Sequence, residues 1–151
     1  MSAPHSSHLR KGRFSEPGRI YLVTFTTYRR SPRFHDWDQA STVASRLADS
    51  SSWHTAKLMC WVLMPDHWHG LLELGDESLD RAVGRARARA TLAWREKVSD
   101  QGALWARDFH DHALRREEDV LQVARYIVAN PLRAGLADSI RQYPYWNAIW
   151  L

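Results

Sequence analysis

Two histidines flank a tryptophan in the run Met64–Gly70, which reads Met-Pro-Asp-His-Trp-His-Gly. In an extended strand, residues i and i+2 project from the same face, so His67 and His69 would lie side by side while Trp68 points to the opposite face. Neutral imidazoles are good ligands for a divalent ion. Two ligands do not complete a metal site, so we expect a third group to come from elsewhere in the fold.

The context of this triplet favours a site over a chance occurrence. Short His-x-His patterns arise by chance, and an isolated histidine is more often an ordinary surface or core residue than a ligand. Here an apolar run over 58–64 and the dipeptide Pro65-Asp66 precede the triplet, and a further apolar run over 71–74 follows it. This order predicts a hairpin with the histidines at the start of its second strand.

A second segment, from Glu117 to Pro131, predicts a helix with a tyrosine turned away from its apolar side. The apolar stripe comprises Val120, Leu121, Ala124, Ile127 and Val128. At helical spacing Tyr126 falls on the far side of this stripe, and Asn130 follows one turn later on the same side. Tyrosine can act as a covalent nucleophile, and an asparagine carbonyl could supply the missing metal ligand. The alternative for Tyr126 is a surface tyrosine that covers a neighbouring loop.

The elements that would position these residues alternate in a simple order. Hydrophobic periodicity predicts strands over 20–26, 57–64, 67–74 and 107–114, and helices over 37–48, 78–98 and 117–129. The first six elements match a ferredoxin-like βαββαβ unit, an α+β fold with an antiparallel sheet, to which a C-terminal helix with the tyrosine is added. In that topology the first and third strands are central. The second strand becomes an apolar edge, which invites cover by the aromatic tail (143–150) or by another subunit.

Composition narrows the class of protein. Lysine and arginine number 21 against 17 acidic residues, a modestly basic balance that permits nucleic-acid binding. The single Cys60 excludes an internal disulfide and fits a reducing cytoplasm. No apolar run approaches the roughly 20 residues that span a bilayer, so we expect a cytoplasmic protein with no membrane segment. We expect residues 1–18 to form a flexible basic arm and residues 19–151 to form a single domain.

Two further patterns remain open in meaning. Arg81, Arg85 and Arg89 recur every four residues and would form one basic stripe, either a solvated helix face or a contact with a DNA backbone. His110 and His112 form a second His-x-His pair on the predicted fourth strand. If that strand lies two places from the third strand in the sheet, His110 and His112 could orient the ligands of the first pair or bind a phosphate beside it. The alternative is a separate metal site on the fourth strand.

Taken together, these segments resemble a known family. The run Val62–Leu72, with its Pro-Asp-His-Trp-His core, and the run Arg125–Leu136, with Tyr126 and Asn130, are similar to segments of the REP-associated tyrosine transposases, which are IS200-like, single-tyrosine HUH transposases. Residues 21–26 and 105–114 also look like family segments. The resemblance covers nearly the whole chain beyond about residue 18.

The resemblance implies a metal-dependent endonuclease and transposase that cleaves and rejoins single-stranded DNA near palindromic, REP-like hairpins. Tyr126 would match the nucleophile that becomes linked to a 5′ phosphate, and His67 and His69 the ligands of Mg²⁺ or Mn²⁺. Asn130 would match the third, helix-borne ligand. Trp68 departs from the pattern, because smaller residues are commoner between the histidines.

The expected partner is single-stranded or hairpin DNA, bound by a monomer or a homodimer. The candidate DNA contacts are Arg81, Arg85, Arg89, Arg125, Arg133, His110 and His112. Two other functions remain as alternatives: a nucleic-acid-binding regulator that keeps this fold without the chemistry, and a structural metalloprotein in which the four strand histidines hold zinc.

Overall fold

A computed structural model describes residues 15–115 and 119–150. The main elements follow in chain order: β1 (Ile20–Thr26), α2 (Trp37–Ala48), β2 (Lys57–Met64), β3 (His67–Glu73), α3 (Leu79–Val98), β4 (His110–Ala113), α4 (Val120–Val128), α5 (Asn130–Arg133) and β5 (Trp146–Ala148). Short 3-10 turns η1 (Tyr28–Arg30), η2 (Arg33–His35), η3 (Ser50–Ser52) and η4 (Ile140–Gln142) connect them. Most of the expected basic arm, residues 1–14, lies outside the described residues.

The strands form one antiparallel sheet in the order β4-β1-β3-β2-β5. The first four positions reproduce the ferredoxin-like arrangement, so the predicted α+β fold is confirmed. β3 carries the histidine pair and occupies the middle of the sheet, where strands on both sides restrain its backbone.

β2 is the edge of the four-strand ferredoxin-like unit, as predicted, and the tail adds a fifth strand beside it. β5 pairs with residues 60–62 of β2. The backbone N–H of Leu63 donates to the carbonyl of Tyr145 at 2.9 Å, and the Tyr143 hydroxyl donates to the carbonyl of Leu63. Of the two covers expected for this apolar strand, the structure therefore uses the chain's own aromatic tail.

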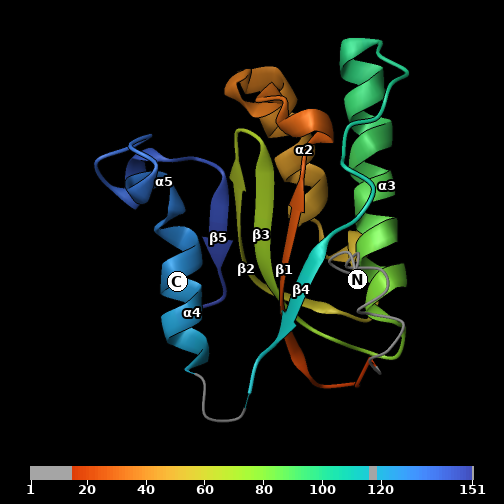
Figure 1. Cartoon of the computed structure of the whole chain (residues 1–151), viewed down its shortest axis with the longest axis vertical. Coiled ribbons are helices and arrows are strands. Elements are labelled where there is room, and N and C mark those ends of the chain that lie inside the picture. The colour runs from red at the N-terminus through yellow and green to blue at the C-terminus, as the bar shows by residue number, and fades with distance from the viewer. Residues whose placement is uncertain (1–14, 116–118, 151) are drawn as a thin grey trace, which may run out of the picture.

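The two faces of the sheet are covered by different helices. On one face Trp68 is fully buried and stacks on Phe25, at 4.8 Å between ring centroids, and on Trp53, at 5.4 Å. Figure 1 shows α2 and α3 on one side of the sheet and α4 on the other. Trp53 follows η3, and its Nε1 donates to the carbonyl of Leu47 in α2 at 2.8 Å, so Trp68 faces the α2–α3 layer. His67 and His69 alternate with Trp68 and must face the α4 side.

Two predicted elements differ in detail from those observed. β4 is shorter than the predicted strand over 107–114, and Trp105 contributes only an isolated bridge to Thr27. Arg87 on α3 donates to the carbonyl of Ala106, so this backbone group is bonded to a side chain instead of a strand partner. On α4, Leu121 is 39% exposed and does not belong to the buried stripe. Within the described residues, no helix is long and apolar enough to cross a membrane.

Candidate active site around the histidine pair

The histidine pair lies at the start of β3, beside the end of β1. His69 is opposite Thr24 and His67 is opposite Thr26 in the antiparallel register. The two imidazole rings are 4.6 Å apart between centroids and nearly perpendicular. The side chain of His67 is mostly buried, but 16% of it is exposed, so solvent still reaches the pair.

Each histidine uses one ring nitrogen to bond a polar neighbour. Nδ1 of His67 donates to Oδ1 of Asp66 at 2.7 Å, and Nδ1 of His69 shares a hydrogen bond of 2.7 Å with Oγ1 of Thr24. Such contacts fix the orientation of an imidazole. They leave Nε2 as the ring nitrogen that can coordinate a metal ion. Two oriented imidazoles with Nε2 available form a donor set that fits a divalent ion.

The protonation state of His69 fits the same role. Burial lowers the pKa of His69 to about 4. Positive charge on three neighbours acts in the same direction, first on His67 and then on Arg133 and Arg30. His69 is therefore neutral near pH 7, and a neutral imidazole is the form that binds metal.

Asp66 connects the histidine pair to a nearby arginine. Its Oδ2 accepts from Nε of Arg30 at 3.0 Å while its Oδ1 accepts from His67. Partial burial alone would raise the pKa of Asp66, but the hydrogen bonds from His67 and Arg30 outweigh burial and lower that pKa. Asp66 is thus a carboxylate that holds His67 in place.

Tyr126 lies on the exposed side of α4, as the helical periodicity predicted, and 63% of it is accessible. The guanidinium of Arg133, on α5, lies 3.7 Å from the centre of the Tyr126 ring, and its Nη2 donates to the carbonyl of Tyr126 at 2.7 Å. The positive charge of Arg133 also contributes to the lowered pKa of His69. Arg133 therefore contacts the tyrosine of α4 and adds to the positive potential around the histidines of β3.

Asn130 begins the short helix α5, one helical turn after Tyr126. Its Nδ2 donates to the carbonyl of Ile127 at 3.3 Å, so its Oδ1 is the end of the amide left for another partner. In the chain segments that the structure describes, no group of three or more His, Cys, Asp or Glu side chains could hold a metal ion. A third protein ligand to the pair would have to be of another type, and a side-chain amide is one.

His110 and His112 lie on the same sheet face as the first pair. They pair with Thr24 and Leu22 of β1, so β4 is two places from β3 in the sheet. This is the position in which they could support the first pair. Both residues are exposed. Across the described segments the four strand histidines do not come together as one site, so the zinc-binding alternative has no geometry to support it.

The candidate arginines divide between the two layers. Arg125 and Arg133 belong to α4 and α5, on the histidine side, and are exposed. Arg81, Arg85 and Arg89 belong to α3, in the opposite layer (Figure 1). Arg85 forms a bidentate ion pair with Glu77, and Nη1 of Arg89 donates to Oγ of Ser51 at 2.7 Å. The two sets cannot contact the same phosphate.

Sequence reasoning missed the residues that support the histidines. The sequence predicts a strand over 20–26 but assigns no role to Thr24 or to Arg30. The signal that could have found Thr24 is the antiparallel register: once β1 and β3 are paired, a hydroxyl opposite a ligand histidine is a candidate partner. Asp66 could have been found from its position next to His67.

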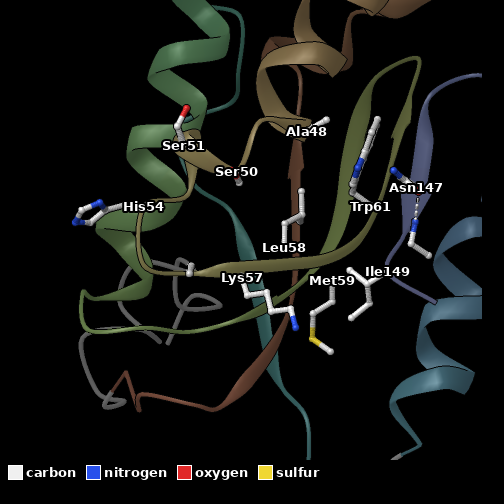
Figure 2. A pocket seen from close by; sticks show the side chains of 12 residues that line it. Ala48, Ser50, Ser51, His54, Lys57, Leu58, Met59, Trp61, Asn147 and Ile149 are labelled. Atoms are coloured by element: carbon white, nitrogen blue, oxygen red, sulfur yellow. Dashed lines mark hydrogen bonds between the residues drawn. The ribbon is translucent and has the colours of Figure 1, made fainter. Parts of the chain in front are cut away.

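A separate pocket of about 680 Å³ lies beside the first half of β2. Figure 2 shows residues that line it, which come from β2 (Lys57 and Trp61), from η3 (Ser50 and Ser51) and from β5 (Asn147). None of the proposed site residues lines it. The pocket is therefore distinct from the histidine site and does not enter the chemistry below.

Comparisons with known proteins place the chain in a family. The profile of the IS200-like transposase family matches residues 18–130, which include the histidine pair, Tyr126 and Asn130. A Haemophilus influenzae protein named as a REP-associated tyrosine transposase is 21% identical over 140 residues, covering 85% of this chain and 78% of that protein.

Solved structures resemble the fold. A REP-associated tyrosine transposase bound to a REP hairpin superposes with a TM-score of 0.68 at 19% identity, over 97% of this chain and 82% of the other. A bacterial tRNA(His) guanylyltransferase-like protein in complex with GTP gives 0.56 at 15% identity, over 85% of this chain and 68% of the other. Because the same fold carries different chemistry in these two neighbours, the family follows from the sequence profile and not from the fold. That profile spans most of the chain, so the protein belongs to the family of IS200-like transposases.

Proposed function

We propose that this transposase is a single-tyrosine, metal-dependent nuclease of the HUH type, which cleaves and rejoins single-stranded DNA beside REP-like hairpins. The observation that carries the proposal is Arg133, whose guanidinium stacks on Tyr126 and whose charge contributes to the lowered pKa of His69. It supports a single site made of a nucleophile from α4 and a ligand pair from β3. The hairpin substrate is inferred from the similarity to the REP-associated proteins.

In the proposed reaction, Oη of Tyr126 attacks the scissile phosphorus. A bond forms between Oη and phosphorus, and the bond from phosphorus to the 3′ oxygen breaks. The tyrosine proton is lost, and a proton is taken up by the departing 3′ oxygen, so the products are a 5′-phosphotyrosine and a free 3′ hydroxyl. Rejoining is the reverse attack by a 3′ hydroxyl. Arg133 is placed to hold the Tyr126 ring and to offer positive charge to the phosphate.

His67, His69 and the Oδ1 of Asn130 would hold the divalent ion, Mg²⁺ or Mn²⁺. When bound, the ion would polarise a phosphoryl oxygen and orient the scissile phosphate. Thr24 and Asp66 keep the two imidazoles oriented, and the lowered pKa of His69 keeps it from binding a proton instead of a metal.

The test is a covalent adduct. The full chain is incubated with single-stranded hairpin DNA and Mn²⁺ and then denatured. We expect DNA-linked protein in the wild type, none after chelation, and none in Tyr126→Phe, which removes one oxygen atom and keeps the ring that Arg133 contacts.

DNA binding by Tyr126→Phe separates this proposal from the alternative of an inactive regulator. The proposal expects this variant to bind the hairpin as tightly as the wild type. A wild type that binds hairpins and never forms an adduct would support the regulator.

A further inference from the structure

The turn that follows β1 has an unusual backbone. In η1, Arg29 has φ 56° and Arg30 has φ 55°, both in the left-handed region. Residues with a Cβ rarely adopt that region, because Cβ approaches the carbonyl oxygen, and glycine is the usual choice. Two consecutive arginines in this conformation make the turn a candidate functional segment.

Hydrogen bonds hold this turn against the tight turn that joins β2 to β3. The backbone N–H of Thr27 donates to the carbonyl of Asp66 at 2.9 Å, and Oγ1 of Thr27 donates to the carbonyl of Ser31 at 2.7 Å. Thr27 is fully buried. Arg30 adds its bond to the Asp66 carboxylate, whose other oxygen accepts from His67. The turn is therefore fixed directly beside the candidate active site.

The outer surface of the turn presents an aromatic ring and a cation. Tyr28 is 43% exposed, and the guanidinium of Arg29 lies 5.1 Å from the centre of its ring. Arg29 is exposed as well, whereas the guanidinium of Arg30, although also exposed, is held by the Asp66 carboxylate. An exposed aromatic ring next to an arginine is the combination that binds single-stranded nucleic acid, by base stacking and by phosphate contact.

We propose that the turn Tyr28–Arg30 is a binding subsite for single-stranded DNA, in which Tyr28 stacks on a base and Arg29 contacts the adjoining phosphate. The inference rests on the proposed function, because the strand held by this turn is the one that leads to the scissile phosphate. Arg30 positions the turn through Asp66. Stacking on one tyrosine is tolerant of base identity, so the subsite would hold the strand without reading its sequence.

The experiment measures binding to a DNA hairpin with a single-stranded oligothymidine extension and to the same hairpin without the extension. All proteins carry Tyr126→Phe, so that binding is separated from cleavage. We expect Tyr28→Ala to weaken binding of the extended hairpin roughly 5- to 100-fold, the range that one stacked base provides. Tyr28→Phe should retain most of the affinity, and the blunt hairpin should bind Tyr28→Ala as it binds the parent.

Arg29→Gly tests the arginine without straining the backbone. Glycine accepts the same φ, so the melting temperature should be unchanged or higher. Loss of one phosphate contact should make the slope of log affinity against log salt shallower by about 0.7. The matched controls are Trp150→Ala, an exposed aromatic at the far end of β5, and Arg46→Ala, an exposed arginine on α2. Both should bind like the parent.

The outcomes separate this inference from the proposed function. If the parent binds neither hairpin, the proposed function fails and the inference fails with it. If the parent binds the extended hairpin and both Tyr28→Ala and Arg29→Gly bind it equally well, the inference is overturned and the proposed function stands. Equal losses on the blunt hairpin would also overturn it, since the turn would then contact the duplex.

Discussion

Each histidine of the pair depends on one neighbouring polar side chain for its orientation. Thr24 reaches His69 from the adjacent strand, and Asp66 reaches His67 from the turn just before it. Neither neighbour would touch a metal ion or DNA in the proposed reaction. Their effect should therefore appear in metal affinity before it appears anywhere else.

Thr24→Val should weaken Mn²⁺ binding about 10- to 100-fold, because the variant keeps the shape of the side chain and removes the hydroxyl that holds His69. Titration calorimetry on the protein without DNA measures this directly. Thr26→Val is the matched control: Thr26 is opposite His67 on the same face of β1, and no hydrogen bond between it and either histidine is present in the described residues. Equal affinity in the Thr24 variant and the wild type would show that the hydroxyl does not position the ligand.

His69 should also make the fold sensitive to acid. Its pKa is near 4 in the folded chain and near 6.5 when unfolded, so between these values the unfolded state binds more protons. Stability contributed by this residue is complete above about pH 6.5 and is lost as the pH falls toward 4, by up to ~3 kcal/mol. Urea unfolding at several pH values should show a smaller loss in His69→Gln than in the wild type. Parallel pH profiles for the two proteins would contradict the burial of a neutral imidazole.

At the scale of elements, the two faces of β3 carry different kinds of side chain, and one strand backbone has to position both. One face carries His67 and His69, whereas Trp68 on the opposite face is fully buried in the α2–α3 layer. Gly70 makes room for this large ring, since a Cβ at that position would lie 2.2 Å from an atom of the Trp68 ring. The departure of Trp68 from the common family pattern is thus accommodated two residues further along the same strand.

Gly70→Ala should therefore destabilise the fold by about 1–3 kcal/mol, because neither the strand backbone nor the packed indole can move without loss of contacts. Chemical denaturation of the variant measures the change. Gly84→Ala on α3 is the control, since a Cβ there meets nothing within 4 Å and alanine favours the helix. A Gly70 variant as stable as the wild type would mean that the Trp68 ring can repack freely.

Most of the strands and helices could be predicted from the sequence, because strands and amphipathic helices carry local periodic patterns of apolar residues. The alternation in residues 20–26 and the stripe around Ala124 and Ile127 are readable without tertiary information. β5 was missed because three residues, Trp146–Ala148, are too short for a pattern and gain their strand conformation only by pairing with β2. Likewise, the contact of Arg133 with Tyr126 depends on the angle between α4 and α5, which residue types do not encode.

At the scale of the whole molecule, the sheet separates two basic surfaces. The α4–α5 side carries Arg125 and Arg133 beside the proposed chemistry, and the α3 side carries the stripe that begins at Arg81. In the stripe, Arg85 and Arg89 already bond to the protein itself. A strand that reaches Tyr126 would therefore meet the first surface.

The salt dependence of binding should distinguish the two surfaces. Arg133→Gln should make the slope of log affinity against log salt shallower by about 0.7 for a single-stranded probe, whereas Arg81→Gln should leave it unchanged. Fluorescence anisotropy over a range of NaCl concentrations gives both slopes. A shallower slope in the Arg81 variant would show that the DNA path extends around the sheet to α3.

The central claim is that Tyr126 forms the bond to DNA, and peptide mapping of the adduct tests it most directly. Trypsin cuts after Arg125 and Arg133, so the tyrosine falls in the short peptide 126–133. After nuclease trimming, mass spectrometry should find this peptide carrying a nucleotide joined through its 5′ phosphate. A nucleotide on any other peptide, such as one with Tyr28 or Tyr143, would contradict the account.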